Sequence, residues 1–435
     1  MRERQEPPTI VQRLTGVRPE EAPTLAWSLL YIGSLFLAYY VLRPIRDELG
    51  VAGGVSNLPW LFTGALLAML LLNPLFGYVV RHFTRERVIS ISYRFFTATL
   101  VVITLLLATS GEGQQMWVGR ALFIWVSVFN LFVVSVFWSF IQDIFDTGQG
   151  RRLFGILAAG ATLGGLLGSA LTTMLVEHVG RTWLIAACVI LIEMAVLASR
   201  KLSHASASLR NEGQNDDAEE PIGGGVFAGM IQVFRSPYLF GLACFILIYS
   251  ITSTFLYFQQ ASYAEANFPT REAKTAFFAN IDLWVHSITL FVQIFLTGRL
   301  MAGLGVLVTL CALPLVSAVG FAALTANPTV GVFVVAQVAR RVTNFALARP
   351  AREVLFTSST RDDRYKAKNF IDTVVYRGGD QVGSWSYAGL MAIGLCIGQI
   401  AVVGVPLSLA WLCLGFWLGR THNQQKIAQA NSAPA

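Results

Sequence analysis

Most candidate functional residues of this sequence are charged. They lie inside long apolar stretches and at the ends of these stretches. An uncharged stretch from Thr24 to Leu42 is followed, within six positions, by Arg43, Arg46, Asp47 and Glu48. A charge inside a membrane span costs at least about 2.5–3.5 kcal/mol on insertion scales, so it tends to face a watery cavity or a partner. Arg43 and Asp47 are four apart, a spacing that lets them pair on one helix face. We therefore expect Arg46 to be the charge least committed to a local partner.

A proline lies among these charges. Pro44 removes a backbone donor, so the helix can kink there while neighbouring helices satisfy the freed carbonyl. We expect the helix to continue past Leu42 along the mouth of a central cavity. The alternative is an ordinary interfacial helix end that carries a salt bridge.

A second polar group lies in the apolar segment 329–348, which contains Gln337, Arg340, Arg341 and Asn344. Steps of four and three residues put Gln337, Arg341 and Asn344 on one helical face, and Arg340 lies one position round from it. Guanidinium groups suit phosphate and carboxylate, so this face is typical of a binding site for an anionic substrate. The alternative is that the helix ends early and both arginines lie at the lipid headgroups.

Two further pairs have the spacing of coupling or gating residues. Asp282 and His286 are four apart; they can relay protons, because histidine titrates near neutral pH, or they can form a structural pair. Arg377 and Asp380 are three apart and can neutralise each other on one helix, with gating as the second role. Asp47 belongs to the same group of candidate coupling residues.

The segments 116–141 and 153–176 offer polar and small residues. Asn130, Trp138 and Gln142 can line a cavity, although burial of Asn130 against another helix is as plausible. A repeated GxxxG pattern, formed by Gly160, Gly164 and Gly168, permits close helix contact.

Composition identifies the class of protein that must position these residues. The chain is 54% hydrophobic and 13% charged, whereas a soluble domain carries about 25% charged residues, so this is a polytopic membrane protein. The net charge of +7 indicates basic cytoplasmic loops rather than a nucleic-acid partner. The five cysteines lie in apolar segments without a CxxC pattern, so neither a metal site nor disulfides are expected.

Hydropathy in windows of about 19 residues predicts an all-α fold with twelve transmembrane helices in two pseudo-symmetric six-helix bundles. The expected organisation is a cytoplasmic segment 1–22, a first bundle 23–199, a polar cytoplasmic linker 200–236, a second bundle 237–420 and a tail 421–435. Within the bundles, spans are expected near 23–43, 57–80, 88–108, 116–141, 153–176, 181–199, 238–260, 275–297, 302–324, 329–348, 371–397 and 399–419.

The loops predict the topology. Lys and Arg follow the even-numbered spans, as at Arg81, Arg151 and Arg299, whereas loops such as SGEGQQM and LTANP lack them. Positive loops stay inside, so both termini are expected in the cytoplasm. A bacterial inner membrane is the expected location of the protein. The lipid bilayer and a small-molecule substrate are the expected partners, and a monomer is favoured.

Enzyme motifs are absent from the sequence. It has no GxxxxGK[ST] of a P-loop ATPase, and no HExxH or GxSxG. We therefore expect no catalytic residues, no cofactor and no metal.

Several motifs carry a family resemblance. GYVVRHFTRER (77–87) and TGRLMAGLGV (297–306) resemble the Gly-and-basic loop motif of the major facilitator superfamily, with Arg81 where the family usually has Asp. YYVLRPIRDELGV, FWSFIQDIFDTGQGRRLFG, NFALARPAREVLF and YKAKNFIDTVVYRGGDQVGS resemble, in order, segments of the nucleotide (ATP/ADP) transporter family of plastids and intracellular bacteria.

The nucleotide-transporter resemblance implies a fold and a substrate class. Arg46 and Asp47 fall at a Lys–Asp position of that family, which implies that Arg46 contacts substrate. Asn344, Arg349 and Asp380 replace a Lys, an Asp and a Lys of the family, and the acid early in its fourth helix has no counterpart near Val126. The resemblance therefore implies the fold and an anionic organic substrate without specifying a nucleotide.

Three functions remain open from the sequence. The first is a secondary transporter of a small anionic solute that works by alternating access, with Arg46, Arg340 and Arg341 converging on substrate. The second is a proton-coupled transporter of a neutral or cationic solute, in which Asp282 and His286 carry the proton. The third is a membrane sensor or assembly factor that has a transporter fold without transport.

Overall fold

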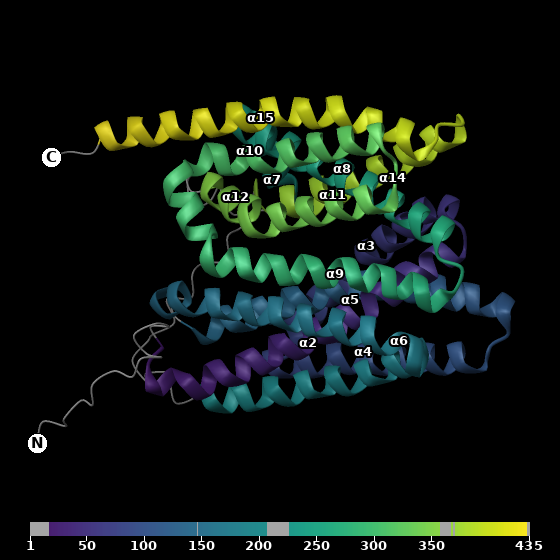
Figure 1. Cartoon of the computed structure of the whole chain (residues 1–435). Coiled ribbons are helices and arrows are strands. Elements are labelled where there is room, and N and C mark those ends of the chain that lie inside the picture. Colours follow the sequence, from purple (N-terminus) through teal and green to yellow (C-terminus); the bar gives the residue numbers. More distant parts are fainter. Residues whose placement is uncertain (1–16, 146, 207–225, 357–366, 369, 433–435) are drawn as a thin grey trace, which may run out of the picture. The chain divides into compact units, whose positions relative to one another are not determined.

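The computed structural model describes residues 17–145, 147–206, 226–356, 367–368 and 370–432, and it is helical throughout these ranges (Figure 1). Ten of the described helices are long and apolar enough to cross a membrane. The chain is therefore a multi-pass membrane protein with an all-α fold.

The first half of the chain forms five long helices. After the 3₁₀ turn η1 (Pro19–Glu21) come α2 (Ala22–Ala52), the turn η2 (Val55–Asn57), α3 (Leu58–His82), α4 (Arg85–Thr109), α5 (Glu112–Ile144) and α6 (Thr147–Ser206). The helix α2 runs through Pro44 to Ala52, which confirms that it does not stop at Leu42. The long α6 is interrupted at Gly180, whose φ of 75° favours glycine, and this break separates the two spans predicted there.

The second half combines long helices with short ones and with two π-helical turns. These are α7 (Val226–Arg235), α8 (Pro237–Asn267), α9 (Arg271–Phe295), α10 (Thr297–Ala326), α11 (Val330–Thr343), the π-helix η3 (Asn344–Ala348), α12 (Arg349–Leu355), the π-helix η5 (Ile371–Val375), α14 (Tyr376–Ala392) and α15 (Ile397–Ser432). Three predicted boundaries differ. Helix α6 extends to Ser206, α7 forms within the predicted linker, and α15 continues to Ser432 through most of the predicted tail. Residues 207–225 of the linker lie outside the described residues.

The chain divides into two compact units. The first contains residues 1–49, 67–216 and 275–283, and the second contains 50–66, 217–274 and 284–435. Residues 275–283 of α9 therefore belong with the N-terminal helices, and residues 58–66 of α3 belong with the C-terminal ones.

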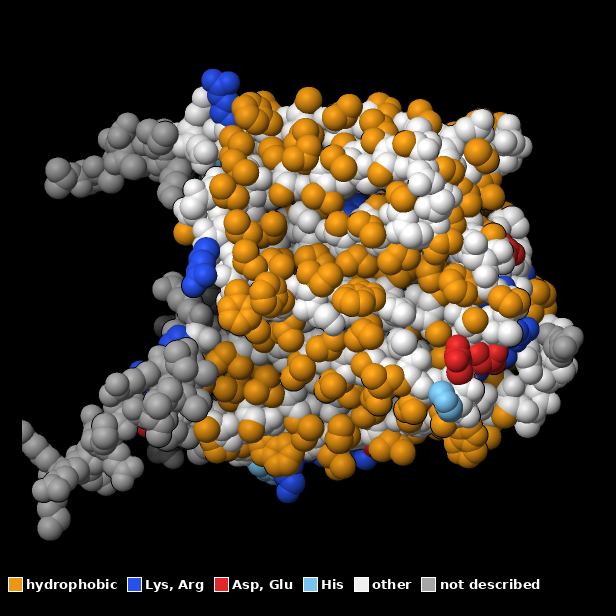
Figure 2. Space-filling view, viewed as in Figure 1, with side chains coloured by type: hydrophobic (Ala, Val, Ile, Leu, Met, Phe, Trp, Pro, Cys, Tyr) orange, Lys and Arg blue, Asp and Glu red, His pale blue; other side chains and the backbone are white. Residues whose placement is uncertain are grey.

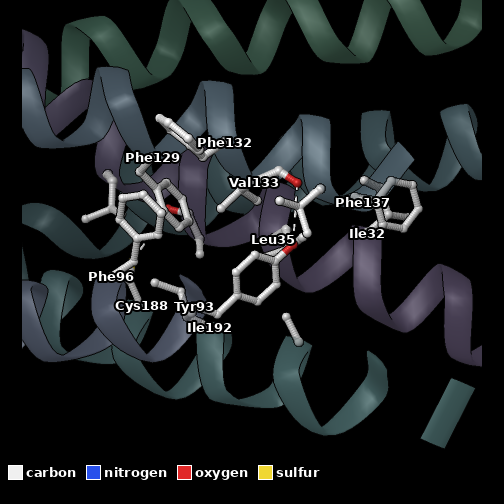
Figure 3. Close-up of a cluster of buried hydrophobic side chains, with 14 of the residues drawn as sticks. Ile32, Leu35, Tyr93, Phe96, Phe129, Phe132, Val133, Phe137, Cys188 and Ile192 are labelled. Carbon is white, nitrogen blue, oxygen red and sulfur yellow. Dashed lines mark hydrogen bonds between the residues drawn. The ribbon is translucent and has the colours of Figure 1, made fainter. Parts of the chain in front are cut away.

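The core of the first unit is largely aromatic, and Figure 3 shows part of it. Tyr31 of α2 and Tyr93 of α4 are both fully buried, and their hydroxyl oxygens are 2.6 Å apart. The Tyr93 hydroxyl also donates to the backbone carbonyl of Val133 over 3.4 Å, and Phe137 packs edge-on against Tyr31. A buried hydroxyl without a partner is costly, so this pairing fixes how α2, α4 and α5 meet.

Glycines bring α6 into close contact with α2. A Cβ added to Gly164 would lie 2.6 Å from the carbonyl oxygen of Gly33, and one added to Gly168 would lie 2.6 Å from that of Leu37. Such contacts are shorter than real Cβ atoms make, so the glycines allow the two backbones to approach. The close contact predicted from the repeated GxxxG pattern is confirmed.

The second unit packs around Trp411 of α15, which is fully buried beside Phe245 and Tyr249 of α8. At the other end of the same core, the Tyr238 hydroxyl donates to the carbonyl of Leu355 over 3.0 Å. Outside these cores, hydrophobic side chains cover the middle of the face shown in Figure 2, and many charged side chains lie toward the helix ends. That distribution fits helices surrounded by lipid.

Candidate functional site

The charged end of α2 is held by ion pairs within the first unit. Arg46 approaches Asp47 with Nη2 2.7 Å and Nε 2.9 Å from Oδ1. Its Nη1 donates to Ser127 of α5 over 3.3 Å, and its guanidinium lies 4.5 Å from the centre of the Phe123 ring. The expectation that Arg46 is the charge least committed to a local partner is therefore wrong.

Arg43 has a partner that the sequence did not suggest. Its Nη1 lies 3.2 Å from Oδ1 of Asp282 in α9, whereas its Nε lies 3.9 Å from Oδ2 of Asp47. The predicted pair of Arg43 and Asp47 is thus present, but its distance is longer than those of Arg43 to Asp282 and of Arg46 to Asp47. Asp47 therefore lies between the two arginines, with Oδ1 toward Arg46 and Oδ2 toward Arg43. Asp47 and Asp282 are 3% and 2% exposed, so these are ion pairs held away from water.

The last charge of the segment, Glu48, is fully buried and reaches α6. Nη1 of Arg181 lies 3.2 Å from its Oε2, and Nη2 of Arg181 donates to Gln115 over 3.2 Å. Arg181 follows Gly180, so the break in α6 positions this arginine. Arg181 was not among the residues predicted from the sequence, although Glu48, a carboxylate near the membrane, needs a basic partner.

The three polar candidates of α5 lie apart from these ion pairs. Trp138 packs edge-on against Phe137 and Phe154, with ring centres 5.3 and 5.7 Å apart. Asn130 is half-buried, and Gln142 is exposed. The α5 residues that contact Arg46 are Ser127 and Phe123. Neither was a candidate from the sequence, because a small hydroxyl or a phenylalanine in an apolar helix gives no distinct signal.

In the second unit, Arg340 lies at the centre of a polar cluster. It is 2% exposed, and its Nε donates to Ser317 over 3.2 Å. Its terminal nitrogens donate to Ser253, to Thr252 and to the backbone carbonyl of Tyr249, over 3.3, 3.1 and 3.2 Å. Its guanidinium also lies 5.3 Å from the centre of the Tyr249 ring. Each of these partners is electrically neutral.

The predicted neighbours of Arg340 are buried with it. Gln337 donates to Gln260 over 3.0 Å, and Asn344 donates to the Tyr249 hydroxyl over 3.0 Å. Gln337, Arg341 and Asn344 are 6%, 8% and 5% exposed. The chain continues beyond them as η3 and α12 to Leu355. The helix therefore does not end at the arginines, and both arginines are buried within the protein.

Asp380 of α14 is the acid of a second network in this unit. Its Oδ2 lies 3.3 Å from Nη1 of Arg377, which confirms the predicted contact. Its Oδ1 accepts from Ser250 over 2.5 Å and from Thr254 over 3.4 Å, both on α8. Beside it, a Cβ on Gly379 would lie 2.6 Å from that of Ser250. This close packing is what a structural role predicts.

His286 lies one turn beyond Asp282 on α9 and is 5% exposed. Asp282 and His286, the predicted proton-relay pair, are thus both buried on α9, and Asp282 pairs with Arg43. Among the described residues, no group of three or more His, Cys, Asp or Glu side chains could hold a metal ion.

The buried arginines of the two units differ in the partners of their hydrogen bonds. In the first, Arg43, Arg46 and Arg181 are matched by Asp47, Asp282 and Glu48. In the second, Arg340 and Arg341 lie side by side in α11, and the hydrogen bonds of Arg340 go to neutral groups. An arrangement of this kind can attract an anion.

The comparisons with known proteins agree with a transporter fold. An ADP,ATP carrier protein of Chlamydia trachomatis is 26% identical over 46% of this chain and 43% of its own length. Another, of Chlamydia muridarum, is 22% identical over 73% of this chain and 69% of its own length. The chain thus spans less than half of the first relative and about two thirds of the second. These relatives support the predicted resemblance to nucleotide transporters.

Solved structures resemble the whole fold at low identity. A bacterial homologue of the human lysosomal transporter Spinster, inward-facing and unoccupied, has a TM-score of 0.56 at 15% identity and covers 94% of this chain and 99% of its own. The peptide transporter PepTSo of the POT family has a TM-score of 0.62 at 12% identity and covers 92% of this chain and 98% of its own. The model of the Major Facilitator Superfamily matches residues 25–367. With its membrane-spanning helices and buried intramembrane charges, this chain belongs to the Major Facilitator Superfamily.

Proposed function

We propose that this protein is a secondary active transporter that moves a small anionic organic solute by alternating access. The observation that carries the proposal is Arg340, a guanidinium that is 2% exposed and hydrogen-bonded to neutral groups. Burial of a charge without an opposite charge is costly, and a bound anion would offset that cost. Because Arg341 follows it directly, the local charge is doubled.

The solute we propose is nucleotide-like or another phosphorylated or carboxylated compound. Guanidinium groups match phosphate and carboxylate geometry. The relatives named as ADP,ATP carrier proteins favour the nucleotide-like end of this range. We further propose that the protein lies in a bacterial inner membrane with both termini in the cytoplasm, since basic loops follow the even-numbered spans.

The test uses purified protein in a thermal-shift screen against nucleotides, sugar phosphates and organic acids, followed by uptake into liposomes. A ligand at 100 times its Kd stabilises the folded state by about 2.7 kcal/mol, so binders raise the unfolding temperature. The expected hit is anionic, and its neutral counterpart, such as a nucleoside in place of a nucleotide, should give no shift. Equal shifts with both forms would contradict the proposal.

Variants of Arg340 test whether its positive charge binds the anion. Arg340→Gln should weaken anion binding at least about tenfold, as expected when about 1.4 kcal/mol or more is lost, whereas Arg340→Lys keeps the charge and should lose less. Ser317→Ala removes one hydrogen bond but no charge, so it should lower stability without changing anion selectivity. Arg420→Gln, an exposed arginine of α15, is the matched control.

A proton-coupled transporter is the second candidate, favoured by the buried Asp282 with His286 one turn away. Protonation of Asp282 would release Arg43 and change the ion pairs at the end of α2. Uptake into liposomes with and without a pH gradient separates the candidates. Flux that depends on a counter-substrate and is independent of the pH gradient would contradict proton coupling.

A further inference from the structure

An arginine on the outer surface of the first unit has no role in the proposed transport site. Arg94 is exposed although it lies nine residues after the start of α4, within the candidate span Glu86–Thr109. At 1.5 Å per residue, it lies about 13 Å along the helix from Arg85. Its exposed neighbours on this face are Ile91 and Phe95, at 44% and 53%. An exposed guanidinium among apolar side chains at this depth needs an anionic partner or must extend toward the headgroups.

Other basic residues gather near Arg94 where α4 packs against α6. Arg87 lies two turns before Arg94 on the same side of α4 and is exposed. From α6, Arg200 donates through Nη2 to Ser90 over 3.1 Å, and Lys201 is exposed beside it. The contact between Arg200 and Ser90 places the two helices in register, with Ser90 between Arg87 and Arg94 along α4.

The acidic groups near this cluster are fewer. Glu86 accepts a hydrogen bond from Ser203, and Glu193 lies two turns along α6 from Arg200, half-buried in the span. The four basic side chains therefore outnumber these two acids. The excess of positive charge lies beside a lipid-facing surface rather than in a loop.

Apolar surface continues from the basic cluster. Leu197 of α6 is 60% exposed one turn before Arg200. Ile91 and Phe95 of α4 also line a hollow of about 200 Å³, together with Leu72, Leu75, Val79, Ser92, Phe96 and Phe132. Cationic groups beside an apolar hollow match the two parts of a phospholipid.

We propose that this face of α4 and α6 binds an anionic phospholipid, with Arg94, Arg87 and Arg200 at its phosphate and its acyl chains over Ile91 and Phe95. Guanidinium binds phosphate through parallel hydrogen bonds, which explains arginine rather than an apolar residue at position 94. The lipid belongs to the leaflet on the side where α4 begins. The site is separate from the proposed transport site and does not depend on it.

Native mass spectrometry of the full-length protein in a neutral detergent tests the proposal. Phosphatidylglycerol should give persistent adducts, and phosphatidylcholine at the same concentration should give at least fivefold fewer. Arg94→Gln should lower phosphatidylglycerol binding at least fivefold, while Arg94→Lys should retain most of it. Arg420→Gln, which removes an exposed arginine of the second unit, should bind as the parent does.

Three results would overturn the proposal. They are equal binding of the two lipids, unchanged phosphatidylglycerol binding by Arg94→Gln, and loss of the lipid adducts when millimolar inorganic phosphate competes, since that would indicate a site for a soluble anion. The unfolding temperature without lipid shows whether the variant is folded. If Arg94→Gln fails that check, Arg87→Gln, at a second exposed position, provides the same measurement.

Discussion

At the scale of single residues, the buried charges in the first unit are arranged in ion pairs. The end of α2 shows this most clearly, because Arg46 pairs with Asp47 at 2.7 Å while Arg43 pairs with Asp282 of α9 at 3.2 Å. A buried ion pair contributes little relative to apolar packing, but removal of one partner leaves an uncompensated charge. The pairs should therefore behave as coupled units rather than as independent contacts.

A double-mutant cycle measures this coupling. Asp282→Asn and Arg43→Gln should each destabilise the protein, and the double variant should lose less than the sum, with a coupling free energy of about 1–3 kcal/mol. The physical reason is the 3.2 Å contact between side chains that are 4% and 20% exposed. Thermal or denaturant unfolding in detergent gives the values, and additive losses would show that the contact is energetically irrelevant.

A second residue-scale prediction concerns Glu21, which precedes the first span. Burial raises the pKa of Glu21, but the Arg152 guanidinium, at 2.7 Å, and the Arg18 backbone N–H, at 2.9 Å, outweigh it and hold the pKa below its usual value. A lowered pKa in the folded state stabilises the protein above the unfolded pKa, near 4.5, and this stability is lost as the pH falls through the folded pKa.

Glu21→Gln should therefore lower the unfolding temperature at pH 7 and reduce its fall between about pH 5 and pH 3. Glu20→Gln, a change of the neighbouring exposed acid, is the matched control. Unfolding temperatures measured across this pH range check the prediction. A parallel fall in both variants would assign the acid sensitivity to other carboxylates.

At the scale of elements, helix packing depends on small residues as much as on apolar ones. Gly164 and Gly168 of α6 lie against the backbone of α2, while Gly379 and Gly383 of α14 lie against α8. In each case the neighbouring atoms include backbone, which cannot move aside as a flexible side chain can. Both helix pairs carry charged residues of the candidate site, so the glycines determine how closely those residues are held.

Gly164→Ala should destabilise the protein by about 1–3 kcal/mol, because the new methyl would meet the Gly33 carbonyl at 2.6 Å. Gly155→Ala in the same helix is the matched control, since nothing lies within 4 Å of its Cβ. That change should be neutral or stabilising, because alanine favours helix over glycine by about 1 kcal/mol. Equal effects at the two positions, measured by thermal unfolding, would contradict close packing.

At the scale of the whole molecule, the superfamily fold and the basic loops together predict an orientation. Cys396 lies in the turn between α14 and α15 and is exposed, and this turn follows an odd-numbered span. With both termini in the cytoplasm, that thiol lies on the opposite side of the membrane.

A variant that retains only Cys396 should react with a membrane-impermeant maleimide in intact spheroplasts. A cysteine in place of Gln424, an exposed position on α15, should react only after permeabilisation. Gel shift after labelling gives the readout. Labelling of position 424 in intact spheroplasts would reverse the proposed topology.

The sequence by itself determined the class of the protein and its intramembrane charges. Apolar runs long enough to span a bilayer leave the backbone few alternatives to helix, so the long helices were largely predictable, whereas α7 formed within the predicted linker. Glycine spacing likewise indicated where α6 packs closely. The contact between Arg377 and Asp380 was predictable because both lie within one turn of one helix.

Ion-pair and hydrogen-bond partners that lie far apart in the chain could be identified only from the tertiary structure. Arg43 with Asp282, Glu48 with Arg181, and Arg340 with Ser317 join positions whose separation follows no local period. Hydrophobic periodicity assigns a residue to a face of its own helix, but a hydrogen bond or ion pair depends on which other helix meets that face and at what height. The sequence therefore identified most of the buried charges, although not Arg181. Helix packing determined which of them have an oppositely charged partner and which, as at Arg340, donate hydrogen bonds to neutral groups.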